Sequence, residues 1–256
     1  MTLSFQLEHY GLVGSTNDMA RDRAIAGADE GLVIRADRQT AGRGRRGRAW
    51  SSPEGNLYFT FLLRPACSPA MAATLSFVTV IALGDVLAEL LPDRLVQHKW
   101  PNDVLIGGKK ISGILLETAG SSPDRLDWLI VGIGVNIVSH PDQALYPTTD
   151  LRHEGAAAIS APELLDRFLA RFAVHHDTWS EGGFAALLPA WKARAAGIGG
   201  DIVVRLENHT LEGRFVDLDG DGMLMLNMQD GRTRRIAAGV VFFPGQMPDS
   251  DPAKRG

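Results

Sequence analysis

The segment from Met71 to Leu91 restricts the fold most strongly, because it is long, largely apolar and ended by Pro92. It exceeds the length of an ordinary strand, and a proline cannot continue a helix. The segment therefore predicts a buried helix that supplies much of the hydrophobic core. Asp85 and Glu89 interrupt its apolar run, which stays short of the roughly 20 apolar residues that span a membrane, so no membrane segment is expected.

The composition excludes several classes of protein. Over 256 residues, 45% hydrophobic and 22% charged residues exclude a disordered, collagen-like or coiled-coil chain. The 26 Lys and Arg against 30 Asp and Glu give a net charge of −4, so an anion site must be local. The single cysteine, Cys67, excludes an internal disulfide and is interpreted as a small buried or half-buried hydrophobe. Because residues 1–13 lack a signal-peptide pattern, a cytoplasmic location is expected.

Apolar patterning predicts alternating strands and helices over the first 197 residues. Strands are expected at 5–13, 32–36, 56–63 and 129–137, and helices at 15–26, 71–91, 162–179 and 184–195. Residues 94–106 and 111–118 flank Gly107 and Gly108 and predict a single β-hairpin. Residues 140–160 have two prolines and no sustained period, which indicates a surface loop.

Short strands separated by turns begin at Asp201. They are expected at 202–206, 211–217, 223–228 and 233–243. We therefore expect an α+β protein, with a mixed β-sheet flanked by helices at residues 1–197 and a small β-barrel or sandwich at 198–244. Residues 245–256 are polar, contain two prolines and are expected to be a disordered tail.

A loop rich in glycine and arginine joins two of the predicted strands. Residues 39–50 read QTAGRGRRGRAW, with four arginines and three glycines in the last nine positions. Guanidinium groups bind phosphate oxygens through paired hydrogen bonds, and glycines let the backbone close on a ligand. We interpret this segment, called the Gly-Arg loop below, as a binding loop for a phosphorylated small molecule. A solvated basic turn and an RNA-binding segment are the alternatives.

Two polar segments further along the chain are suited to chemistry. Residues 99–103 (KWPND) set a cation, an aromatic ring, an amide and a carboxylate at a strand end, where Asp103 suits Mg²⁺ or a proton and Asn102 suits a base or ribose. Of the adjacent Lys109 and Lys110, only one faces a given side of a strand, and we choose Lys110 as the inward charge. A plain turn and a solvated lysine pair are the respective alternatives.

Other chemical templates fail on inspection. Residues 107–112 lack the glycine and Ser or Thr positions of a phosphate loop, and residues 132–134 lack the third glycine of a dinucleotide fingerprint. No Gly-x-Ser-x-Gly elbow is present, and no His, Asp or Glu set shows metal-ligand spacing. These results favour electrostatic over nucleophilic catalysis.

Five motifs, taken together, resemble those of biotin protein ligases in order and spacing. They are GSTN at 14–17, QTAGRGRRGR at 39–48 with Trp50, KWPND at 99–103, KISG at 110–113 and GIGVN at 132–136. The resemblance extends from about Ser4 to Phe243. It implies a mixed sheet flanked by helices, as in class II aminoacyl-tRNA synthetases, followed by an SH3-like barrel. The implied enzyme joins biotin to ATP, with Mg²⁺ as activator and pyrophosphate as product, and passes the biotinyl group from biotinyl-5′-AMP to a lysine of a carboxylase biotin carrier domain.

The resemblance also implies a role for each matching residue. Catalysis is assigned to Lys110, Arg45 and Asp103, with Asp103 as Mg²⁺ ligand or proton acceptor. Biotin contacts are assigned to Ser15, Thr16, Asn17, Gln39, Arg43, Gly44, Arg45, Lys110 and Gly113. Nucleotide contacts are assigned to Arg46, Arg48, Trp50, Asn102 and Asn136, and none to residues 234–239. The sequence begins at the catalytic region, without the winged helix-turn-helix domain of some members, so DNA binding is not expected.

Two other functions stay open at this point. A lipoate ligase or octanoyltransferase shares the scaffold and the lysine, although the Gly-Arg loop and the KWPND segment favour biotin. A nucleic-acid-binding module would use the Gly-Arg loop and the small β-domain. The net acidic charge of the chain and the absence of interleaved aromatic residues in that loop weigh against this function. The sequence decides neither the carrier protein nor whether the enzyme is a monomer or a homodimer.

Overall fold

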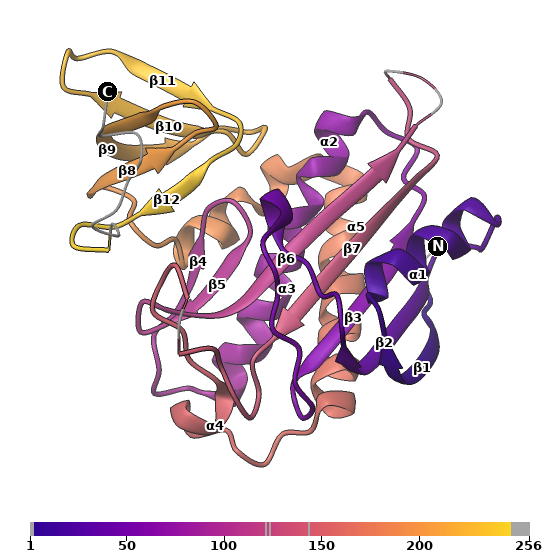
Figure 1. Cartoon of the computed structure of the whole chain (residues 1–256). Helices are drawn as coiled ribbons and strands as arrows, with labels where there is room; N and C mark the ends of the chain where they lie inside the picture. Colours follow the sequence, from indigo (N-terminus) through magenta and orange to yellow (C-terminus); the bar gives the residue numbers. More distant parts are fainter. Residues whose placement is uncertain (1–2, 121, 123, 143, 247–256) are drawn as a thin grey trace.

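The computed structural model describes residues 3–120, 122, 124–142 and 144–246, and Figure 1 shows their arrangement. The strands of this part are β1 (Gln6–Val13), β2 (Leu32–Gln39), β3 (Leu57–Leu63), β4 (Val96–Lys99), β5 (Asp103–Ile106), β6 (Lys109–Ala119), β7 (Trp128–Val135), β8 (Asp201–Arg205), β9 (Thr210–Leu218), β10 (Leu224–Met228), β11 (Thr233–Ile236) and β12 (Val240–Phe242). The helices are α1 (Thr16–Ile25), α2 (Pro69–Ala73), α3 (Leu75–Leu90), α4 (Leu151–Glu154) and α5 (Ala161–Ala193), with a 3₁₀ turn η1 (Arg45–Gly47).

The first domain is built on a seven-stranded mixed sheet in the order β1-β2-β3-β7-β6-β5-β4. β1 and β2 are parallel and connected through α1, whereas the other neighbouring strands are antiparallel. The central strands β3 and β7 are buried along their whole length. A strand covered on both faces is apolar on both faces, which agrees with the largely apolar sequence of these segments, in which Thr60 is the polar exception.

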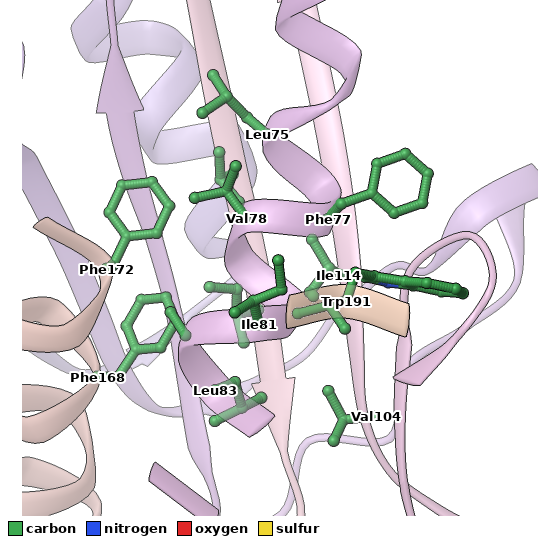
Figure 2. Packing of buried hydrophobic residues seen from close by; sticks show 14 of the residues in the cluster. Leu75, Phe77, Val78, Ile81, Leu83, Val104, Ile114, Phe168, Phe172 and Trp191 are labelled. Atoms are coloured by element: carbon green, nitrogen blue, oxygen red, sulfur yellow. The ribbon is translucent and has the colours of Figure 1, made fainter. Parts of the chain in front are cut away.

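Helices α3 and α5 cover one face of this sheet, and α1 packs on β2, β3 and β7 from the other. On the first face, the rings of Phe61 and Phe172 lie 4.7 Å apart between their centroids and make an edge contact. Figure 2 shows Phe168 and Phe172 of α5 in one layer with Val78 and Ile81 of α3. The core therefore lies between the two long helices and the sheet.

The predicted apolar helix is confirmed as α2 followed by α3. By length and composition alone, Pro69–Leu90 is sufficient for a membrane span, with a mean hydropathy of 1.9, although the sequence analysis placed its apolar run below that length. In the structure, 78% of the apolar window is buried inside the protein. Packing in the core accounts for its composition.

The C-terminal strands form a second, antiparallel sheet in the order β11-β10-β9-β8-β12, beside the β4 and β5 end of the large sheet (Figure 1). The indole of Trp100 donates a hydrogen bond to the Gly222 carbonyl at 3.0 Å, which joins the two domains. The single strand predicted at 233–243 was wrong. The chain turns at 237–239, and β12 pairs with β8 instead of continuing β11.

Three other local predictions need refinement. The arm expected at 94–106 is two strands, because the chain reverses at 100–102 and β4 pairs with β5; the turn at Gly107 and Gly108 lies where it was predicted. The loop at 140–160 contains α4, which Asp150 caps. The two helices expected at 162–179 and 184–195 are both present and follow each other within α5, on either side of a break at Gly183 (φ 65°). Of the predicted tail, residues 247–256 lie outside the described part.

Candidate active site

A cavity of about 730 Å³ opens where the five sequence motifs meet. Its wall is formed by the start of α1, the Gly-Arg loop, the β4–β5 turn, β6 and β7, the loop after β7, and residues 239–241 before and within β12. Every residue that the sequence analysis assigned to the site lines this cavity except Arg46, which is exposed and not part of the lining. The fold thus gathers segments more than 100 residues apart.

Lys110 and Asp103 form an ion pair in this cavity. Lys110 Nζ lies 2.6 Å from Asp103 Oδ1, and both side chains are largely buried. The neighbouring Lys109 faces away, half-exposed, with its Nζ 3.4 Å from Glu154 Oε1. The choice of Lys110 as the inward lysine is therefore confirmed. Asp103 is the only carboxylate among the described lining residues.

Arg45 brings a second positive charge into the cavity. Its Nη1 donates to Asn102 Oδ1 at 3.0 Å, and burial lowers the pKa of the Arg45 guanidinium from its usual value. A guanidinium still stays protonated at neutral pH because its ordinary pKa is above 12. Arg45 is therefore a partly desolvated cation beside Asp103 and Lys110, in a position to bind an anion.

Arg43 contacts α1. Its Nη1 and Nη2 lie 2.8 and 2.6 Å from the two carboxylate oxygens of Asp18, and this hydrogen bonding holds the pKa of Asp18 below its usual value. A bidentate pair of this kind fixes the guanidinium plane. Arg43 therefore anchors the start of the Gly-Arg loop to α1 while still lining the cavity.

Uncharged polar groups form another part of the wall. The Gln39 side-chain oxygen accepts hydrogen bonds from the backbone amide and the hydroxyl of Thr16, at 2.9 and 3.1 Å. Thr60 on β3 donates to Asn17 Oδ1 at 2.7 Å. Because these side chains hold one another in place, they present a preorganised set of donors and acceptors to a neutral polar ligand.

Glycines on β7 make room for the site. A Cβ on Gly134 would overlap the Trp50 ring, and a Cβ on Gly132 would overlap the Asn17 side chain. The Trp50 Nε1 atom is buried and lacks a hydrogen-bond partner within the described ranges. Two glycines spaced by two residues lie on the same face of a strand. That spacing signals close approach of other groups, whereas in the sequence the two glycines were used only as part of the GIGVN motif and as a failed dinucleotide fingerprint.

Sequence reasoning left Lys99 and Tyr146 out of the site. Lys99 is 3% exposed, with its Nζ 3.7 Å from the centroid of the Tyr146 ring, and burial lowers its pKa to about 8. The sequence does offer a signal for Lys99, because this residue is the first of the KWPND segment. Tyr146 lies in a loop with no distinguishing pattern, and the C-terminal wall at 239–241 is likewise visible only in the fold.

The comparisons with known proteins bear on this cavity directly. Residues 11–136 match the sequence model of the "Biotin/lipoate A/B protein ligase family", and residues 197–243 match that of the "Biotin protein ligase C terminal domain". Over 237 residues the chain is 40% identical to a biotin--[acetyl-CoA-carboxylase] ligase of Paracoccus denitrificans, a match that covers 90% of this chain and 98% of the relative. This chain belongs to the biotin protein ligase family.

Solved biotin protein ligases have the same fold. The enzyme of Aquifex aeolicus, in complex with biotin and ATP, aligns with a TM-score of 0.79 and 28% identity over 93% of this chain and 97% of its own. The enzyme of Leishmania major, in complex with biotinyl-5-AMP, gives 0.63 and 25%, over 91% and 99%. The predicted fold class is thereby confirmed, and β8 to β12 correspond to the C-terminal domain of biotin protein ligases.

The buried ammonium of Lys99 predicts a pH dependence of stability. Its pKa falls from 10.5 to about 8 on folding, so between these values the unfolded chain binds a proton that the folded protein does not. The free energy of unfolding of this biotin protein ligase therefore rises with pH over that window. Relative to Lys99→Met, we expect the wild type to gain roughly 2 kcal/mol between about pH 7.5 and about pH 9.5, measured by urea unfolding. Parallel curves for the two proteins would contradict this.

Proposed function

We propose that this protein joins biotin to ATP to form biotinyl-5′-AMP, and then transfers the biotinyl group to a lysine of a carboxylase biotin carrier domain. The observation that carries the proposal is the meeting of Lys110, Arg45 and Asp103 in one cavity lined by all five family motifs. It is supported by relatives bound to biotin and ATP and to biotinyl-5-AMP. We also propose that the protein is located in the cytoplasm, because its free cysteine, Cys67, is compatible with a reducing compartment.

The first half-reaction brings two anions together. A carboxylic acid such as biotin is already ionised at pH 7, so its oxygen attacks the α-phosphorus of ATP without a general base, and the bond to the pyrophosphate breaks. The barrier is mutual repulsion of negative charge. Lys110 and Arg45 lower it by placing positive charge where negative charge accumulates, in a cavity where the field is screened less than in water.

The cavity fits a Mg²⁺ ion that travels with ATP. Such an ion usually keeps several waters and takes one or two carboxylates together with the phosphates, and Asp103 supplies the single carboxylate of the described lining. When bound, the ion would neutralise charge on the pyrophosphate leaving group. Asp103 also pairs with Lys110, so the Lys110 ammonium and the Mg²⁺ ion would both be held beside the phosphates.

The second half-reaction gives Asp103 another task. The attacking lysine of the carrier must lose a proton, and Asp103 is the described carboxylate in the cavity that can accept it or orient the amine. We expect Asp103→Asn to transfer biotin from preformed biotinyl-5′-AMP about 10²-fold more slowly, measured in single-turnover assays. Asp37→Asn, which alters an exposed carboxylate on β2, is the control and should transfer normally. A normal rate for Asp103→Asn would reject the proton or orienting role.

Substrate choice tests the proposed function as a whole. The family model that matches residues 11–136 includes both biotin and lipoate ligases, so lipoate is the second candidate substrate. In an ATP–pyrophosphate exchange assay we expect label exchange with biotin and none above background with lipoate. Exchange with lipoate alone would assign the chain to the other branch, and exchange with neither acid would reject adenylate formation.

A further inference from the structure

Two histidines and one aspartate meet outside the cavity, where the chain leaves β7 and enters α4. His140 Nδ1 lies 2.6 Å from Asp150 Oδ2, and His153 Nδ1 lies 2.9 Å from the same oxygen. One potential ligand atom from each residue lies within 4.8 Å of the other two. The sequence analysis found no such set, and the fold corrects it. His140 precedes Asp150 by ten residues, so only the closed loop brings it near.

Among the residues that the structure describes, no lysine or arginine pairs with the Asp150 carboxylate. Its side chain is 0% exposed, and in the described part of the chain its partners are the two imidazoles and the backbone amide of His153, at 2.8 Å. A buried carboxylate is costly unless a cation or metal ion offsets its charge. The two imidazoles converge on it from separate segments, and the side chain of His153 is 67% exposed, which leaves a path from solvent.

We propose that His140, Asp150 and His153 bind a divalent transition-metal ion such as Zn²⁺. Two imidazole nitrogens and one carboxylate oxygen are ligands that such ions favour, whereas Mg²⁺ and Ca²⁺ favour oxygen alone. Zn²⁺ lies about 2.0–2.2 Å from nitrogen and oxygen ligands, so the two N···O distances of 2.6 and 2.9 Å need to lengthen by less than about 1 Å. Each imidazole then carries its proton on Nε2, and water completes the tetrahedron.

The bound ion would restrain the loop that forms one wall of the cavity. His140 and Asp150 mark the two ends of a loop whose Tyr146 covers Lys99. Backbone hydrogen bonds tie the same loop to β6: the Lys110 amide donates to the Pro147 carbonyl at 2.8 Å, and the Thr149 amide donates to the Lys110 carbonyl at 3.0 Å. Joining the ends of the loop through a metal ion therefore restrains the segment against the catalytic lysine without placing the ion among the reactants.

The test is a calorimetric titration of the chelator-treated 256-residue chain with Zn²⁺ alone. We expect one bound equivalent in the wild type, and affinity at least tenfold weaker in both His140→Ala and His153→Ala. His9→Ala is the matched control, because His9 pairs with Asp37 at 2.8 Å on the surface without a third ligand, and it should bind as the wild type does. Asp150→Asn keeps an oxygen for the α4 cap but removes the charge, and it should also lose the ion.

The change in Tm on Zn²⁺ binding, measured by thermal unfolding, is an independent test. Zn²⁺ at about 100 times the wild-type Kd should raise the Tm of the wild type by roughly 5 °C or more, and that of His153→Ala by no more than about half as much. The proposal is overturned if the wild type takes up no more Zn²⁺ than the His140→Ala/His153→Ala double variant, which would leave a purely hydrogen-bonded clamp. Equal affinity in the wild type and both single variants would overturn it as well. Neither result depends on biotin or ATP, so the proposed function is tested separately.

Discussion

Replacing Lys110 with alanine is expected to slow biotin-dependent pyrophosphate release about 10²- to 10³-fold in a protein that stays folded. The substitution removes the ammonium that lies 2.6 Å from Asp103 Oδ1 and leaves that carboxylate facing the two anionic substrates. The local potential thus becomes less favourable for the attacking oxygen, although Arg45 is kept. Pyrophosphate release under multiple turnover measures the loss, and circular dichroism checks the fold.

Lys109→Ala is the matched control for this experiment. The two lysines are adjacent on β6, but Lys109 is half-exposed and pairs with Glu154 at 3.4 Å. Glu154 is buried but keeps the Thr149 hydroxyl at 2.7 Å and Arg94 at 3.6 Å when Lys109 is removed, so the rate should stay within about twofold of the wild type. A near-normal rate in Lys110→Ala, or an equal loss in both variants, would remove Lys110 from the catalytic set.

Gly134→Ala is expected to weaken ATP binding about 10- to 100-fold, measured by calorimetry. The added Cβ would overlap the Trp50 ring and force it off the surface of β7. Stacking of a base on an aromatic side chain is worth about 1–3 kcal/mol, which corresponds to that range if the nucleotide contact implied for Trp50 is stacking on the base. Biotin binding should change far less, because the polar groups at Gln39 and Thr16 are kept.

Gly11→Ala controls for the general effect of replacing a strand glycine. Gly11 lies in β1, and a Cβ there meets no atom within 4 Å, so both ligands should bind with unchanged affinity. Trp50→Ala should reproduce the loss seen with Gly134→Ala. Undiminished ATP affinity in Gly134→Ala would show that the position of Trp50 does not matter to the nucleotide.

The parts of the fold that were predictable from sequence are those set by local physics. The helix α3 follows from an apolar run that ends at Pro92, and the β5–β6 turn follows from Gly107 and Gly108, whose φ values of 56° and 78° are unfavourable for other residues. Strand pleating decides that Lys109 and Lys110 face opposite ways, and Lys110 was chosen as the inward lysine from its place on the strand, before the family resemblance supported that choice.

The remaining features depend on contacts between distant segments. The reversal between β4 and β5 exists because these strands pair with each other, and the sequence alone allowed one continuous arm. Tyr146 reaches Lys99 because the loop after β7 folds back on β6, which no periodic signal indicates. The Arg43 contact with Asp18 is similar: the sequence shows a basic loop, but only the fold shows which arginine is anchored to α1.

A crystal structure with biotin bound tests the central claim most directly. The account predicts biotin in the cavity, with its carboxylate within hydrogen-bond reach of Lys110 Nζ and its uncharged ring system against Thr16, Asn17 and Gln39. The Gly-Arg loop should direct Arg45 toward that carboxylate. Biotin bound elsewhere, or with its carboxylate turned away from Lys110 and Arg45, would contradict it.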